Sequence, residues 1–228
     1  MIKKSKKILY NFACRSRKEK MFEAIENILS LSKYDNFLIQ LTLDVDDSVL
    51  IDKDVVDRIN SYGDKVKAHY GISKSKVDAI NRDVRLCTDW DILVNMSDDM
   101  RFLVKGFDLT IIKAFEDYFP NGDGFIHFND GNQKVLSTMS ILDRKHYDRF
   151  LYVYHPSYMS LFCDNEAQDV AKLLGCYKYM GDSVNIIKHQ HPLHDSNFKM
   201  DKQYQKTESF YHVDGRNYRN RKKINFGL

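Results

Sequence analysis

Short apolar runs alternate with amphipathic stretches through the first half of this chain. Short apolar runs between polar residues are typical of buried strands, whereas apolar residues three or four positions apart are typical of helices that cover a sheet. Strands that alternate with helices form βαβ units, so the pattern predicts an α/β fold with a mostly parallel central sheet flanked by helices. We expect strands over residues 7–12, 37–43, 65–70 and 91–96, with helices over 18–31, 52–62 and 73–85.

The second half of the chain is less regular. Its pattern predicts helices over 107–119 and 165–174, strands over 124–128, 135–141 and 185–191, and a helix from residue 203 that leads into a basic tail. Neither an internal repeat nor a low-complexity linker interrupts the chain. We therefore expect one domain over residues 1–200, followed by a C-terminal helix and basic tail over residues 201–228.

The composition is that of a globular protein from a reducing compartment. Of the 228 residues 43% are hydrophobic, and the four cysteines are scattered without a Cys-x-x-Cys pair. No segment reaches the about 20 apolar residues of a membrane span. The apolar run that follows the Lys-rich start is too short for a signal peptide. We expect a cytoplasmic protein with reduced thiols and without a transmembrane segment.

Basic residues gather near both ends of the chain although its net charge is only +3. Lysines crowd residues 3–7, and arginines and lysines crowd residues 216–223. We interpret both runs as solvated tails, because such runs are usually solvated, although they can also contact phosphates, nucleic acid or an anionic membrane surface.

Two common nucleotide-binding motifs are absent. The sequence holds neither a Gly-x-Gly-x-x-Gly segment nor a P-loop, and only ten residues are glycine. These absences argue against an NAD site and against a Walker-type ATP site. Any phosphate bound by this chain must be met by side chains, helix ends or a metal ion.

Polar clusters follow all four strands of the first half. They lie at residues 12–17, 44–47, 71–76 and 97–99, and the third leads into a helix that contains Asn81. A solvated loop explains any one of them alone. The carboxyl ends of parallel strands meet at one edge of a sheet, where open α/β sheets bind their ligands. Their joint occurrence therefore predicts a single site, with arginine and a helix N-terminus suited to phosphate.

Two adjacent carboxylates, Asp98 and Asp99, end the fourth strand. They repel each other unless a positive group lies between them and a substrate. A divalent cation that bridges to a diphosphate satisfies this requirement. The alternative is a strand that ends in a solvated turn, since aspartate is a common turn residue.

Two further groups of polar residues occur in the second half. His189 and His191 are two positions apart, so on a strand both imidazoles face the same side. A zinc site made of histidines is the alternative to a role in the acidic site, but no Cys or Glu stands at zinc-motif spacing around them. Asp164 and Glu166 open a predicted helix, where an acid either caps the helix or acts as a general base.

The order of these motifs resembles that of GT-A-fold glycosyltransferases, particularly the family-2-like group. Phe-Ala-Cys-Arg-Ser-Arg after the first strand is similar to the Phe-Pro-Thr-Arg-x-Arg opening of that family, and Asp-Val-Asp-Asp to its nucleoside-binding acid loop. Gly-Ile-Ser-Lys-Ser-Lys resembles the start of its phosphate-side helix, and Ser97-Asp98-Asp99 stands where its Asp-x-Asp metal motif falls. The resemblance covers residues 7–195 and implies a single GT-A domain, a Rossmann-like nucleotide-binding fold.

The resemblance also implies roles for residues that bind the nucleotide sugar. In the first segment, Ala13 and Arg15 would line the base and the phosphates. In the acid loop, Asp44 or Asp46 would hold the base or ribose. Lys76 and Asn81 would lie near the diphosphate or ribose. Ser97 replaces the first acid of Asp-x-Asp, so its contact with ribose or metal would be weaker or would pass to Asp98. The nucleotide-sugar residues are Ala13, Arg15, Asp44, Asp46, Lys76, Asn81, Ser97 and Asp98.

The resemblance also implies which residues bind the metal ion and which residue is the general base. Asp99 would bind Mn²⁺ or Mg²⁺, and the late metal ligand of the family would be His191, which we favour, or His189. Asp164 would deprotonate the acceptor hydroxyl, with Glu166 as the alternative base. The motif around these two acids differs from the commoner Glu-Asp pair, so the choice between them stays open.

These roles imply a metal-dependent glycosyltransferase. It would move a sugar from a nucleoside diphosphate sugar, with a UDP-sugar favoured, to an acceptor hydroxyl with inversion. The acceptor would be a glycan, a lipid-linked molecule or a nucleic acid. Two alternatives stay open: a nucleotidyltransferase, and a nucleic-acid-binding module that uses the basic ends and the aromatics Tyr204, Phe210, Tyr211 and Tyr218. A glycosyltransferase that modifies DNA bases would combine the glycosyltransferase hypothesis with the nucleic-acid-binding hypothesis.

Overall fold

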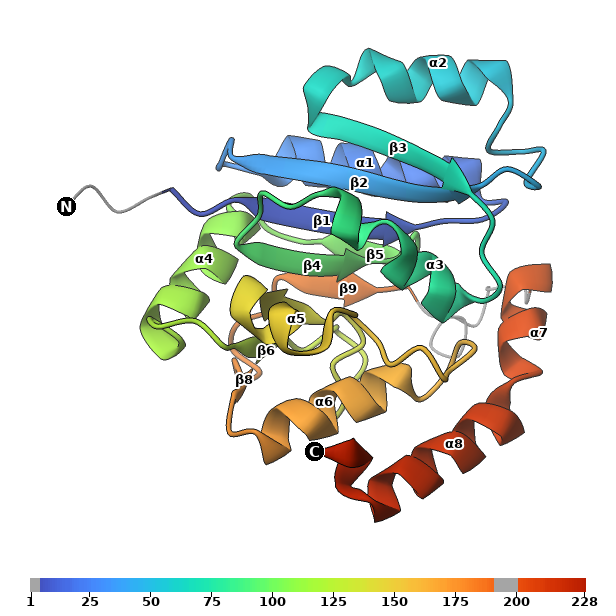
Figure 1. Cartoon of the computed structure of the whole chain (residues 1–228). Coiled ribbons are helices and arrows are strands. Elements are labelled where there is room, and N and C mark those ends of the chain that lie inside the picture. Colours follow the sequence, from blue (N-terminus) through green and yellow to red (C-terminus); the bar gives the residue numbers. More distant parts are fainter. Residues whose placement is uncertain (1–4, 191–200) are drawn as a thin grey trace.

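A seven-stranded sheet forms the centre of the molecule, in the order β3-β2-β1-β4-β7-β6-β8 (Figure 1). The computed structural model describes residues 5–190 and 201–228. Strands β1 to β4 are parallel, β7 is antiparallel to β4 and β6, and β6 runs parallel to β8. The strands are β1 (Ile8–Ala13), β2 (Phe37–Asp44), β3 (Val66–Gly71), β4 (Ile92–Met96), β6 (Phe125–His127), β7 (Ile141–Asp143) and β8 (Tyr177–Tyr179).

Helices cover both faces of this sheet. Side chains alternate along β1, so Ile8 and Tyr10 pack against α1 and α4 on one face while Leu9 packs against α3 on the other. In Figure 1, α3, α5 and α6 lie in front of the sheet and α1 lies behind it. The helices are α1 (Lys18–Leu31), α2 (Lys53–Ser61), α3 (Lys76–Arg82), α4 (Phe107–Tyr118), α5 (Arg144–Phe150), α6 (Cys163–Leu173), α7 (Lys202–Glu208) and α8 (Tyr211–Lys223).

The architecture predicted for the first half is confirmed, and most of its boundaries are correct within two residues. Helix α3 is shorter than the predicted range 73–85, because the Ser75 hydroxyl accepts a hydrogen bond from the backbone of Asp78 at 3.0 Å and caps the helix there. The first half therefore forms the predicted mostly parallel sheet flanked by helices.

The strand predicted over 135–141 is wrong for most of its length, because only Ile141 belongs to a strand. Polar side chains hold this segment in a loop instead. The backbone N–H of Ser137 donates to Gln168 at 2.9 Å, and the Thr138 hydroxyl donates to Asp130 at 2.8 Å. The strand predicted over 185–191 is β9 (Ile187–His189), and residue 191 lies outside the described residues.

A second, two-stranded sheet lies at the edge where β4 ends. Strand β5 (Met100–Phe102) pairs with β9 in antiparallel register, and Met100 is the partner of His189. The Gln190 backbone N–H also donates to the Asp99 carbonyl at 2.7 Å. This pairing brings a late segment of the chain beside the two acids that follow β4.

The helix predicted from residue 203 is divided into α7 and α8, and the basic residues at 216–223 lie on α8, which packs against α6. The fully buried Asp214 anchors α8 by accepting hydrogen bonds from the backbone N–H groups of Met159, Ser160 and Leu161 at 2.8–3.0 Å. The boundary at residue 200 stays a prediction. Among the described residues, no helix is long and apolar enough to cross a membrane.

Candidate active site

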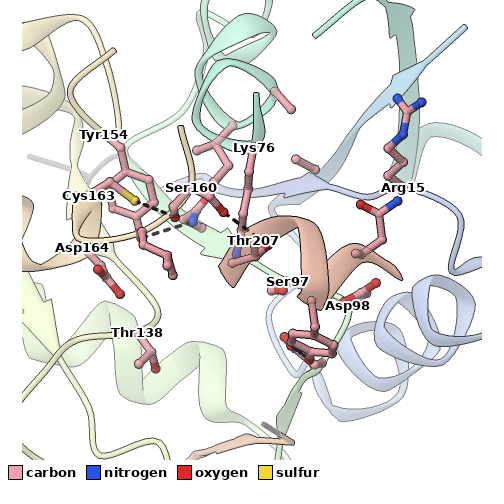
Figure 2. A pocket seen from close by; sticks show the side chains of 18 of the residues that line it. Arg15, Lys76, Ser97, Asp98, Thr138, Tyr154, Ser160, Cys163, Asp164 and Thr207 are labelled. Atoms are coloured by element: carbon pink, nitrogen blue, oxygen red, sulfur yellow. Dashed lines mark hydrogen bonds between the residues drawn. The ribbon is translucent and has the colours of Figure 1, made fainter. Parts of the chain in front are cut away.

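A cavity of about 410 Å³ opens at the carboxyl ends of β1, β2 and β4 (Figure 2). Loops after these strands, the start of α3, the start of α6 and helix α7 line it. The structure therefore gathers the loops that the sequence pattern assigned to one site. The predicted residues that line the cavity are Ala13, Arg15, Asp44, Lys76, Ser97, Asp98, Asp99, Asp164 and His189.

Three predicted site residues do not line this cavity. Asp46 is exposed and pairs with Arg15 at its rim. The Asn81 amide donates to the Tyr154 carbonyl at 2.7 Å and accepts from the Val153 backbone at 2.9 Å, so it holds a loop. Glu166 is buried on the opposite side of α6. His191 lies outside the described residues.

One end of the cavity is bordered by a network of arginine and aspartate. Arg15 donates to Asp44 at 2.8 Å and to both carboxylate oxygens of Asp46 at 2.8 and 2.9 Å. The buried Asp44 also accepts from Ser73 at 2.6 Å and from Arg82 at 2.9 Å. The Arg15 guanidinium lowers the pKa of Asp46. These partners hold the Asp44 and Arg15 side chains in fixed positions at this end.

The two acids after β4 are both buried, and each has a positive partner from the chain itself. Asp98 accepts from Arg17 at 3.1 Å, although burial and the neighbouring Asp99 raise the pKa of Asp98. Burial also acts to raise the pKa of Asp99, but His189, Tyr204 and Lys76 outweigh it and hold that pKa well below its usual range. The positive charge that the acid pair requires is thus supplied in this structure by side chains.

His189 lies between two carboxylates. Its Nε2 faces Asp99 Oδ1 at 3.5 Å, and its Nδ1 faces Asp130 Oδ2 at 3.5 Å. Burial lowers the pKa of His189, but both carboxylates raise it, with a net result of about 9. The backbone N–H groups of Asn132 and Gln133 each donate to Asp130 at 2.8 Å, which fixes this carboxylate behind the imidazole.

The residues around Asp99 fit a divalent cation. Two ligand atoms that share such an ion through bonds of about 2.1–2.2 Å lie about 3.0–3.5 Å apart, and the Asp99 oxygen and His189 nitrogen are separated by 3.5 Å. Histidines that bind metals usually give their second nitrogen to a carboxylate, the position that Asp130 occupies here. The imidazole must lose its proton before it can act as a ligand.

Helix α7 closes one side of the cavity. The Tyr204 hydroxyl donates to Asp99 Oδ2 at 2.5 Å, and Asp201 at the N-cap accepts two hydrogen bonds from Arg17 at 2.7 and 2.8 Å. The Arg17 guanidinium also lies 4.3 Å from the centre of the Tyr204 ring. The C-terminal segment is therefore part of the site.

Asp164 lies in the first turn of α6, on the cavity wall. Figure 2 shows Asp164 with Thr138 and Tyr154 at one end of the cavity, whereas Arg15 is at the other end. Burial raises the pKa of the Asp164 carboxyl, and the nearby Lys76 opposes that effect. Among the residues that the structure describes, neither Lys76 nor Asp164 forms an ion pair with any residue.

Glu166 lies two residues later and is fully engaged within the fold. It accepts from Arg221 Nε at 2.7 Å, from Arg221 Nη2 at 2.8 Å and from the Tyr158 hydroxyl at 2.7 Å. Its side chain is 4% exposed. These contacts connect α6 to α8 and leave this carboxylate no access to the cavity.

Sequence reasoning missed the roles of Arg17, Asp130 and Tyr204. Arg17 belongs to the same motif as Arg15. Asp130 precedes Gly131, a pattern typical of a turn, and Tyr204 is one of the C-terminal aromatics suited to stacking on bases. No local pattern marks these three residues, since the partners Asp98, His189 and Asp99 lie far from them along the chain.

No protein-family model and no curated protein sequence matches this chain. Solved structures do match. The mannosyltransferase PcManGT from Pyrobaculum calidifontis, in complex with GDP-Man and Mn²⁺, is 11% identical with a TM-score of 0.66, over 91% of this chain and 70% of that one. TarS 1–349 from S. aureus, in complex with UDP-GlcNAc, is 12% identical with a TM-score of 0.63, over 91% of this chain and 66% of that one.

A third match has a different activity in its name. The 4-diphosphocytidyl-2C-methyl-D-erythritol synthase from Anaerococcus prevotii is 12% identical with a TM-score of 0.50, over 91% of this chain and 96% of that one. The higher TM-scores belong to the mannosyltransferase PcManGT and to TarS, of which the chain covers about two thirds. The chain therefore has the GT-A fold that was predicted from its motifs.

Proposed function

We propose that this protein is a metal-dependent glycosyltransferase that moves a sugar from a nucleoside diphosphate sugar to an acceptor hydroxyl. The observation that carries the proposal is a single cavity in a GT-A fold, with a buried acid–imidazole pair, a lysine without an ion pair among the described residues, and a separate aspartate at the far end. Each of these groups matches one part of the donor or one step of the transfer.

The nucleoside is assigned to the end of the cavity near Ala13, Arg15 and Asp44. The Asp44 carboxylate can accept hydrogen bonds from ribose hydroxyls or from a base N–H, and a guanidinium can bind phosphate or stack on a base. The network around Asp44 orients both groups before any ligand arrives. A UDP-sugar is the donor to test first, and TarS, one of the similar structures, was solved with UDP-GlcNAc.

The diphosphate is assigned to the middle of the cavity, beside Lys76 and Asp98. Lys76 has no carboxylate partner among the described residues, so its ammonium is available to phosphate oxygens. Asp99 and His189 would hold Mn²⁺ or Mg²⁺, and the imidazole favours Mn²⁺ because Mg²⁺ prefers oxygen ligands. When bound, such an ion neutralises the charge that develops on the leaving diphosphate, which is worth several kcal/mol.

Asp164 is proposed as the general base. A pKa that burial raises makes this carboxylate a better proton acceptor than an exposed aspartate, and it lies at the end of the cavity away from Arg15. It would remove the acceptor proton as the hydroxyl oxygen attacks the anomeric carbon and the nucleoside diphosphate leaves from the opposite face. A single displacement of this kind inverts the anomeric configuration.

A thermal-shift experiment tests the donor class. The protein is heated with UDP, UDP-GlcNAc, GDP-mannose or CTP, each with Mn²⁺ and with EDTA. A ligand at 100 times its Kd adds about 2.7 kcal/mol of stability, so we expect a clear rise in Tm for one nucleoside diphosphate or its sugar that EDTA removes. If no nucleotide raises the Tm, the proposed donor site is wrong, and salt-sensitive DNA binding becomes the next hypothesis to measure.

The released product separates glycosyl transfer from nucleotidyl transfer. A glycosyltransferase releases a nucleoside diphosphate, whereas a nucleotidyltransferase releases pyrophosphate. The similarity to the 4-diphosphocytidyl-2C-methyl-D-erythritol synthase makes nucleotidyl transfer the second activity to measure. Release of pyrophosphate from CTP, without nucleoside diphosphate from any nucleotide sugar, would contradict the proposal.

A further inference from the structure

Three potential metal ligands meet at the edge of the sheet opposite the cavity. Asp123 lies just before β6, His146 follows the end of β7 in α5, and Cys176 lies just before β8. Strand β7 is antiparallel to β4, and its last residue pairs with Ile92 at the start of β4. The cluster therefore lies at the amino end of β4, whereas Asp98 and Asp99 follow its carboxyl end.

The ligand atoms of these residues are close together. His146 Nδ1 is 3.4 Å from Cys176 Sγ and 3.7 Å from Asp123 Oδ1, and all three ligand atoms lie within 4.8 Å of one another. A tetrahedral zinc ion with bonds of about 2.0–2.3 Å separates its ligand atoms by about 3.3–3.6 Å. The observed separations therefore require only small side-chain shifts to surround one ion.

The backbone holds all three ligands in place. The Asp143 carboxylate accepts from the backbone N–H of Gly124, next to Asp123, and from that of His146, both at 3.0 Å. The Phe125 backbone N–H donates to the Cys176 carbonyl at 2.8 Å. The Asp143 carboxylate and the pairing of β6 with β8 thus fix the relative positions of the three segments before any metal binds.

We propose that Asp123, His146 and Cys176 bind one Zn²⁺ ion, with water as the fourth ligand. The Cys176 thiol loses its proton to solvent and binds as thiolate, and His146 binds through Nδ1. Asp123 binds through one carboxylate oxygen and keeps its other oxygen on Arg149, which now donates to both at 2.5 and 2.8 Å. Two negative ligands balance the charge of the ion, and a Cys, His, Asp donor set suits zinc better than Mg²⁺.

This site is separate from the proposed active site. None of its three ligands lines the 410 Å³ cavity. The side chain of Asp123 is 25% exposed while that of His146 is 7% exposed, so solvent reaches the cluster from the side of Asp123. The ion would join β6, β7 and β8, the part of the sheet with the shortest strands, and would act there as a structural link.

Cobalt binding tests the proposal without any assay of activity. The whole protein is stripped with a chelator and titrated with Co²⁺, which takes tetrahedral zinc sites and gives a thiolate-to-cobalt charge-transfer band. We expect this band at one equivalent of Co²⁺, its loss on addition of Zn²⁺, and its absence in Cys176→Ser. Cys87→Ser is the matched control and should keep the band, because Cys87 is a free, partly buried cysteine outside the cluster.

Two further variants keep the test decisive. Asp99→Asn should keep the band, because Asp99 belongs to the other edge of the sheet. If Cys176→Ser does not fold, as judged by circular dichroism, Asp123→Asn takes its place, and we expect its Co²⁺ affinity to fall by about tenfold or more. A folded wild-type protein without the band, a band that persists in Cys176→Ser, or unchanged affinity in Asp123→Asn would overturn the proposal.

Discussion

The two sides of helix α6 hold acids of the same type in opposite situations. On one side, Asp164 lines the cavity and forms no ion pair among the described residues. On the other side, Glu166 accepts hydrogen bonds from Arg221 and Tyr158 and connects α6 to α8. Asp164 is half-buried, whereas Glu166 is buried. The difference is whether the chain itself supplies every partner, which marks Glu166 as structural and leaves Asp164 available to a ligand.

The acids after β4 lie between these two cases. Asp98 and Asp99 have partners from the chain, but those partners, Arg17, His189 and Tyr204, come from the loops and the helix that border the cavity. Such contacts can be exchanged for a ligand with little change to the core. The four predictions below test this contrast between ligand-directed and structural charges.

The largest effect is expected from Asp99→Asn. Loss of the carboxylate that would bind the metal removes several kcal/mol of transition-state stabilisation, or about a thousandfold in kcat/KM at 1.36 kcal/mol for each factor of ten. Sugar transfer is measured with saturating Mn²⁺ on variant protein whose circular dichroism matches that of the wild type. Asp89→Asn, which removes an aspartate with 73% exposure, is the control. Full activity in Asp99→Asn would contradict the metal role.

Asp164→Asn is expected to lower kcat by about a hundredfold or more, the usual contribution of a general base. The amide oxygen of asparagine can still accept from the Asn165 backbone, as the aspartate does at 2.9 Å, so the helix start is retained. Donor binding, measured by the thermal shift, should not change. A weakened donor affinity with kcat intact would move Asp164 from proton transfer to binding.

Glu166→Gln is expected to lower the stability of the fold and to leave kcat unchanged. It leaves the Arg221 guanidinium, whose side chain is only 18% exposed, without its countercharge, and breaking a buried pair in this way costs about 3 kcal/mol. We expect this loss in the free energy of unfolding in urea, with kcat of the folded protein unchanged. Glu19→Gln on α1 is the exposed control. An unchanged stability together with a large loss of kcat would make Glu166 the base and remove the contrast drawn above.

The smallest effect is expected from Lys76→Met. A hydrogen bond to a charged group contributes about 1.5–3 kcal/mol, so the Kd for the nucleoside diphosphate should rise by about tenfold or more while the fold is kept. Lys113→Met on α4, whose side chain is 71% exposed, provides the control. Equal affinities of both variants and the wild type would show that Lys76 does not contact the diphosphate.

The sequence by itself determined the parallel half of the fold and one edge of the site. Strand periodicity and the acids that end β4 are local features, and parallel strands must bring their carboxyl ends to one edge. Arg15, Asp44 and Asp99 could therefore be assigned to one cavity before the structure was known. The same local rules failed at 135–141, where Asp130 and Gln168 hold the backbone in a loop.

Only the tertiary structure decided which charges face each other. The pairing of β5 with β9 places His189 beside Asp99, and the packing of α8 on α6 brings Arg221, 55 positions along the chain, to Glu166. The Asp123, His146 and Cys176 cluster likewise arises from three separate segments. Periodicity reports which face of an element is buried, but not where the chain later returns, so partners distant in sequence follow from packing alone.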